Sequence, residues 1–154
     1  MEKVIHILVH LYRVYPNSNQ LSFSRSMKLL YLIEWRYAII NFKKLTDIDW
    51  ILTQYGPYYS KLLSIMEESS NFDLHTKFDE NNRQQIIIKF LNKKQDSMLS
   101  SDAIMTIDFV VNHCKNMSWT ELNNIVNSTY AVINSNQNEM INIVTLAKKY
   151  KNAV

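Results

Sequence analysis

The sequence predicts a mainly α-helical α+β fold: a compact helical domain of about six helices with one small antiparallel β-hairpin. Its apolar residues recur mostly at the spacing of amphipathic helices, and a single pair of segments has the composition of strands. One glycine and two prolines are too few for the tight turns of a many-stranded sandwich or barrel. At 154 residues the chain fits one hydrophobic core, so we expect residues 1–154 to form a single domain.

Four helical segments are expected in the N-terminal half, at residues 2–15, about 22–42, 47–53 and about 58–68. Ser22 or Ser24 can cap the second, which is apolar on nearly all faces and is therefore expected to be central and buried. Thr46 and Asp49 resemble a capping box at the start of the short third segment. Pro57 suits the first turn of the fourth, where its missing N–H costs nothing.

The predicted hairpin comprises residues 71–78 and 84–91, joined by a polar connection. Three consecutive isoleucines at 86–88 favour a strand. Because two strands alone are marginally stable in water, we expect this hairpin to lie against the helices. Three further helices are expected: one after Leu99-Ser100, one after the capping box of Ser118 and Glu121, and one over residues 138–151.

The charge balance and the cysteine count restrict partners and compartment. A net charge of +3 is mildly basic and falls short of the concentrated basic patch of a dedicated nucleic-acid-binding protein. The single cysteine, Cys114, allows no internal disulfide and no multi-cysteine zinc site, so a reducing cytoplasm is expected. The apolar runs are shorter than the roughly 18 residues needed to cross a bilayer, and the N-terminal segment has no signal-peptide pattern. We therefore expect no membrane partner.

No recognisable pattern for catalysis or cofactor binding occurs in the sequence. The single glycine excludes the glycine-rich phosphate loops of Rossmann, P-loop and kinase-type sites. His6 and His10 have the spacing of helix-borne zinc ligands, but no glutamate between them and no third ligand nearby completes such a site. Cys114 lies on an apolar stripe, as buried unreactive thiols do. We therefore expect no catalytic residue, no metal and no cofactor, and an enzyme is the least favoured class of function.

The aromatic content is high, with nine tyrosines and three tryptophans. Trp35 lies on the expected central helix, where a large aromatic residue is usually part of the core. Tyr55, Tyr58 and Tyr59 surround the only Gly-Pro pair, at a loop-to-helix junction where side chains can reach solvent. Exposed tyrosines give large contact area at low entropic cost, so this cluster is predicted to bind a protein partner. Stacking on nucleic-acid bases is the competing use.

Two further sets of residues are candidate contacts. If one face of the second helix is exposed, Lys28, Tyr31 and Glu34 would join the tyrosine cluster as partner-binding residues. A nucleic-acid-binding transcriptional regulator, for example of its own operon, is the alternative hypothesis. Its basic surface would comprise His6, His10, Arg13, Lys148, Lys149 and Lys151.

Several short motifs follow one another in a distinctive order. They are Lys28-Leu29-Leu30-Tyr31, Trp50, Tyr55-Gly56-Pro57, the hairpin, Leu99-Ser100, Val110-Val111, Leu122 and Ser128-Thr129. In this order they resemble the Panacea antitoxin domain family, which includes SocA-like and phage-associated proteins. The resemblance covers roughly residues 4 to 135. Residues 53–54 and 130–132 differ from those usual in the family, which indicates a divergent member.

The resemblance implies a small α-rich fold with a short β element that acts as an antitoxin. Such proteins neutralise a toxin encoded beside them, usually by direct stoichiometric binding. The partners that the family implies are diverse and include toxic small alarmone synthetases. A SocA-like member delivers its toxin to a protease, so a protease adaptor is a further alternative. The identity of the toxin and the oligomeric state do not follow from the sequence.

Overall fold

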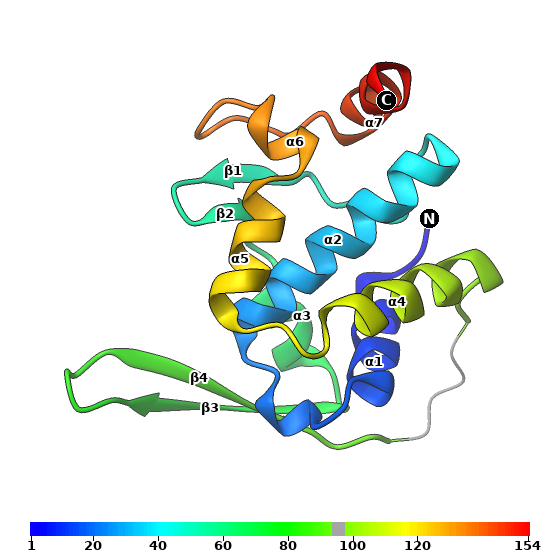
Figure 1. Ribbon diagram of the computed structural model, residues 1–154. Coiled ribbons are helices and arrows are strands. Elements are labelled where there is room, and N and C mark those ends of the chain that lie inside the picture. The colour runs from blue at the N-terminus through cyan, green and yellow to red at the C-terminus, as the bar shows by residue number, and fades with distance from the viewer. Residues whose placement is uncertain (94–97) are drawn as a thin grey trace.

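Helix α2 (Phe23–Asn41) runs through the centre of the computed structural model, which describes residues 1–93 and 98–154 (Figure 1). Helices α1 and α4 lie on one side of it, and the β1–β2 hairpin, α6 and α7 lie on the other. The remaining helices of the described residues are α1 (Val4–Val14), α3 (Leu62–Glu68), α4 (Ser101–Cys114), α5 (Trp119–Asn127), α6 (Tyr130–Ile133) and α7 (Ile143–Ala153). The strands are β1 (Ile51–Thr53), β2 (Gly56–Tyr58), β3 (Phe72–Phe78) and β4 (Gln84–Phe90), and a short 3₁₀ helix η1 covers Ser18–Gln20.

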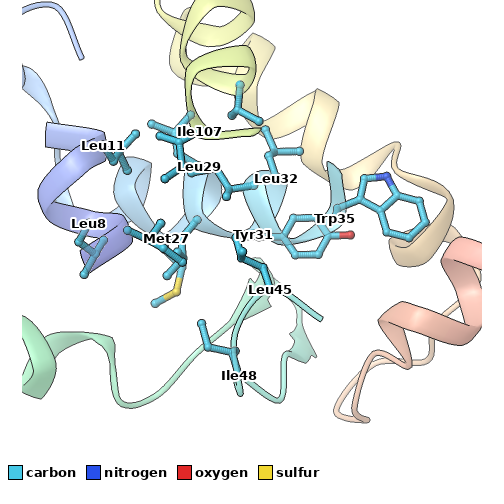
Figure 2. Packing of buried hydrophobic residues seen from close by; sticks show 14 of the residues in the cluster. Leu8, Leu11, Met27, Leu29, Tyr31, Leu32, Trp35, Leu45, Ile48 and Ile107 are labelled. Carbon is cyan, nitrogen blue, oxygen red and sulfur yellow. The ribbon is translucent and has the colours of Figure 1, made fainter. Parts of the chain in front are cut away.

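The central position of α2 follows from its sequence, which is apolar on nearly every face. Figure 2 shows side chains of α2, among them Leu29 and Tyr31, packed against residues of α1, of α4 and of the 45–48 loop. The helix begins where the Ser22 hydroxyl accepts the Arg25 N–H at 3.0 Å, as predicted. It ends at Phe42, which adopts the left-handed conformation with φ of 54°. Trp35 is buried, which confirms its place in the core.

Helices α4 and α5 begin at the predicted caps. The Ser100 hydroxyl accepts the Ala103 N–H at 3.2 Å, and the Ser118 hydroxyl accepts the Glu121 N–H at 3.1 Å. Each bond satisfies one of the N–H groups that the first turn of a helix leaves unpaired. Within the described residues, no helix is both long enough and apolar enough to span a membrane.

The predicted hairpin is present as β3 and β4, with Phe72 opposite Phe90 and Phe78 opposite Gln84. The expectation that it lies against the helices holds for its basal part, where Ile88 is buried and Leu74 and Ile86 also pack against the core. There Phe72 and Phe90 pack around the ring of Tyr12, with ring centroids 4.9 and 5.6 Å from it. The turn end projects away from the helices (Figure 1), and Phe78 is 61% exposed.

A second hairpin, β1–β2, replaces the predicted helical segment over 47–53 and the predicted start of the next helix. Pro57 lies in β2, so its expected place in the first turn of a helix is wrong, and α3 begins only at Leu62. The Thr46 hydroxyl does cap the Ile48 N–H at 3.1 Å, but no helix follows. Gly56, with φ of +105°, directly follows the two-residue turn that joins the strands.

The chain before α7 pairs with β1, which explains why this helix begins later than predicted. The N–H of Asn138 donates to Leu52 O at 2.7 Å, and the N–H of Ile141 donates to Trp50 O at 2.8 Å. In return, the N–H of Leu52 donates to Glu139 O at 3.0 Å. Residues 138–141 are therefore held beside the hairpin, and α7 starts at Ile143. The fold is α+β as predicted, but with seven helices and two hairpins in the described residues.

A candidate protein-binding groove

The β1–β2 turn is fastened to α2 by Lys28. The Lys28 ammonium donates a hydrogen bond to the main-chain oxygen of Tyr55. Within the turn, the Thr53 hydroxyl donates to Gly56 O at 2.8 Å and accepts the Tyr55 N–H at 3.2 Å. The positive φ at position 56 favours glycine, and any side chain there would also collide with the Lys28 ammonium unless the lysine moved.

Tyr31, one turn further along α2, joins this helix to the end of α5. Its hydroxyl and the Thr129 hydroxyl are 2.8 Å apart, and its ring meets Trp50 edge to face at 5.5 Å. The side chain is fully buried, and this burial raises the pKa of its hydroxyl, which therefore stays protonated. Tyr31 thus positions the backbone around the hairpin and does not reach the surface.

A groove of about 640 Å³ lies between the first half of α2, the β1–β2 turn and the start of α5. Three large aromatic side chains border it while remaining open to solvent: Tyr55 is 77% exposed, Tyr58 is 44% exposed and Trp119 is 45% exposed. Phe23, Met27, Pro57 and the polar residues Gln54, Gln137 and Asn138 also line it. Exposed aromatic residues around a concavity are typical of the centres of protein interfaces.

The structure separates the predicted tyrosine cluster. Tyr55 and Tyr58 line the groove, whereas Tyr59 is only partly exposed and its ring lies 6.2 Å from that of buried Trp50. Trp119, which the sequence reasoning missed, lies in the first helical turn directly after the Ser118 cap. It is three residues before buried Leu122, so helical spacing alone gives no sign that its ring is exposed. Its position at a helix end leaves much of its ring uncovered.

Tyr31 and Glu34 do not reach the surface, because this face of α2 is buried, whereas Lys28 is also buried but lines the groove. Glu34 instead holds the loop that leads to β1. Its carboxylate accepts the N–H of Leu45 at 3.0 Å, and the N–H and hydroxyl of Thr46 at 3.2 and 3.0 Å. Burial nevertheless raises the pKa of Glu34 to about 7, although these bonds and nearby Lys44 act in the opposite direction.

The residues of the alternative nucleic-acid surface do not come together. His10 Nε2 lies 3.0 Å from an oxygen of Asp108, and Arg13 donates to Asn92 Oδ1 at 3.0 Å and to Lys93 O at 2.9 Å. The lysines at 148, 149 and 151 are on α7, at the other end of the molecule from α1 (Figure 1). Their charges therefore do not form one continuous basic surface.

The structure also bears on two other candidate sites, a reactive cysteine and a metal site. Cys114 is buried, and this burial raises the pKa of its thiol and disfavours the reactive thiolate. Over residues 1–93 and 98–154, no three histidine, cysteine or acidic side chains are grouped so that they could hold a metal ion.

Two pairs of the motifs that carry the family resemblance are joined by hydrogen bonds: Lys28 bonds to Tyr55 at the groove, and Tyr31 bonds to Thr129 beneath it in the core. A family model described as antitoxin SocA-like, Panacea domain, matches residues 27–131. The chain belongs to this family. No curated protein and no solved structure matches the chain.

The region matched by the SocA-like Panacea family includes most of the groove. The matched region contains the floor of the groove and its three exposed aromatic residues. Phe23, Ser24 and the pair Gln137-Asn138, which complete the lining, lie just outside the match on either side. The groove therefore combines the Panacea region with both of its flanking segments.

Proposed function

We propose that this protein is a cytoplasmic antitoxin that neutralises a cognate toxin by direct, stoichiometric binding, with no catalytic step of its own. Its membership in an antitoxin family supports the role. The observation that supports the binding surface is the gathering of Tyr55, Tyr58 and Trp119 around one groove, each with a substantial exposed area. We name the surface formed by these three residues the aromatic groove.

The aromatic groove has the properties of an interface centre. Large aromatic residues that remain exposed at a concave site contribute most of the binding free energy in many protein interfaces. A standard interface buries about 800 Å² on each partner, which is close to a tenth of the 9045 Å² of accessible surface of this chain. Such an area extends beyond the groove to its rim. A toxin held there is neutralised when its active site is covered or its conformation is locked.

Co-expression with the product of the adjacent gene tests this proposal. We expect the wild-type chain to restore growth and to co-purify with that product. Tyr55→Ala and Trp119→Ala should each weaken the complex about 30-fold, as expected for interface hot spots. The readouts are colony survival and the dissociation constant measured by calorimetry.

Ile133→Ala is the matched control, because Ile133 is an exposed apolar residue of α6 that does not line the groove. We expect it to change affinity by no more than about twofold. No rescue and no recovered partner would reject the antitoxin role. Full rescue by both aromatic variants would reject the groove as the binding surface.

The same protein sample tests the nucleic-acid alternative. DNA binding that weakens with salt, with a slope of about −0.9 per neutralised phosphate, would favour a regulator. Rescue that requires a host protease would instead favour an adaptor role.

A further inference from the structure

Lys28 is a buried cation at the aromatic groove. Its side chain lines the groove, yet the residue is only 5% exposed. The ion pairs between described residues join His10 to Asp108, Lys44 to Asp49 and His75 to Asp73, and none of them involves Lys28. The partner of its ammonium is a neutral acceptor, the main-chain oxygen of Tyr55.

Such a position is unfavourable for an ammonium group. Burying a charge is costly unless an opposite charge and hydrogen bonds compensate for it. Burial accordingly lowers the pKa of Lys28 below its ordinary value, because the charged form loses hydration. Glu34, also buried on α2, differs in that three donors of its own chain surround its carboxylate.

An ammonium has three N–H donors, and the Tyr55 oxygen occupies one of them. The groove beside Lys28 has mostly apolar walls, among them Met27 and Pro57. A single anionic group entering this space would pair with the cation away from bulk water, where an ion pair is stronger. The one charge of a carboxylate matches one ammonium, whereas a phosphate group with a charge of about −1.5 to −2 would leave uncompensated charge among apolar side chains.

We propose that the aromatic groove binds an acidic side chain of the partner protein, whose carboxylate pairs with Lys28 while neighbouring apolar residues pack on Tyr55, Tyr58 and Trp119. This inference rests on the proposed function, because it specifies the chemistry that the same groove recognises. The partner segment it describes is a glutamate or aspartate with large apolar residues on both sides. Charge complementarity with Lys28 favours an acidic residue in the partner segment, and the exposed aromatic rings favour apolar residues on either side of it.

Two short peptides test the inference without the toxin. The probes are acetyl-leucyl-glutamyl-leucinamide and the same peptide with glutamine in the middle, titrated into the full chain. The readout is the shift of the Trp119 indole resonance in NMR spectra. We expect the glutamyl peptide to bind about tenfold more tightly than the glutaminyl peptide, because only it forms a charge-assisted hydrogen bond. The two should differ less at high salt.

Variants assign the preference to one residue. Lys28→Met keeps an unbranched side chain one atom shorter than that of lysine and removes the charge, so we expect equal binding of both peptides. Lys151→Met, which removes an exposed lysine that does not line the groove, should keep the preference. A thermal melt of each variant verifies that it folds. If a variant does not fold, the comparison of the two peptides on the wild type still tests the inference.

Several outcomes would overturn the inference. They are equal affinity of the two peptides for the wild type, no saturable shift up to about 10 mM peptide, and a preference that persists in Lys28→Met. Displacement of the peptide by a lower concentration of inorganic phosphate would also overturn it. A glutamyl preference together with failed toxin rescue would reject the proposed function alone, whereas rescue without that preference would reject only this inference.

Discussion

The two hairpins of this protein differ in what holds them. The β3–β4 hairpin has seven residues in each strand and projects from the helices, with contacts at its base. The β1–β2 hairpin has three residues in each strand, but residues 138–141 pair with its β1 strand and Lys28 bonds to its turn. Because an isolated two-stranded sheet is marginal in water, the short hairpin depends on these outside bonds.

This difference supports the proposal that the aromatic groove, and not the long hairpin, binds the partner. A binding site needs side chains that are held in place before the partner arrives, because ordering them on binding costs free energy. The short hairpin meets this requirement through its links to α2 and to the segment before α7. The turn end of the long hairpin projects from the helices (Figure 1) and leaves apolar residues such as Phe78 exposed.

The largest effect should come from the base of the long hairpin. Phe72 is buried and packs on Tyr12 and Phe90. Phe72→Ala should lower the free energy of unfolding by about 3–5 kcal/mol, because it leaves a cavity at the only packed end of the hairpin. Urea denaturation measures the loss, and amide exchange should show faster opening of β3 and β4 than of β1 and β2.

Phe78→Ala is the matched control, since it removes the same ring from the exposed turn end of the same strand. It should change the free energy of unfolding by no more than about 0.5 kcal/mol. Equal losses in the two variants would show that the whole length of the hairpin is packed, and the contrast between the hairpins would no longer hold.

An intermediate effect is expected from Glu34, which holds the loop leading into the short hairpin. Its pKa is raised from 4.5 to about 7, so the folded state binds its proton more tightly than the unfolded state does. The stability that this proton contributes is therefore complete below pH 4.5 and is lost as the pH rises to about 7. The loss should amount to about 3 kcal/mol, at 1.36 kcal/mol for each unit of pKa.

Denaturation at several pH values, compared with Glu34→Gln, measures this dependence. The glutamine variant cannot titrate at this position, so its stability should not fall over the same interval. If both proteins lose stability equally between pH 5 and 7, another group is responsible and Glu34 is ionised throughout.

The smallest effect concerns the turn of the short hairpin. Gly56→Ala should cost about 2 kcal/mol of unfolding free energy, because of its positive φ and the collision with the Lys28 ammonium. Adding Lys28→Ala should recover part of this cost, since only the backbone strain then remains. Thermal unfolding of the two single variants and the double variant measures the coupling, and strictly additive losses would contradict the collision.

Local signals predicted much of the fold. The serines at 22, 100 and 118 mark the starts of three helices, and the composition of the middle segment marks the long hairpin. Both signals can be read from the sequence because helix caps and strand propensity depend on only a few neighbouring residues. The short hairpin was missed for the opposite reason. β1 pairs with residues 138–141, nearly ninety positions away along the chain, and no local pattern near Thr46 or Pro57 reports this pairing.

The site was predicted in part for similar reasons. Tyr55 and Tyr58 stood out because they flank the only glycine. Trp119 did not, because its spacing from Leu122 matches an inner helical stripe and only the helix end uncovers it. Lys28 was a candidate contact only if one face of the second helix were exposed, and tertiary packing instead buries it against the turn.

The groove takes its lining from four separate stretches, at residues 23–28, 53–58, 119 and 137–138. Its shape therefore exists only when both halves of the polypeptide are present and folded together. A peptide copied from any one stretch would carry at most two of the three exposed rings and would lack the geometry that arranges them. Inhibitors or transplanted versions of this surface must consequently reproduce the whole scaffold from α2 to the residues before α7.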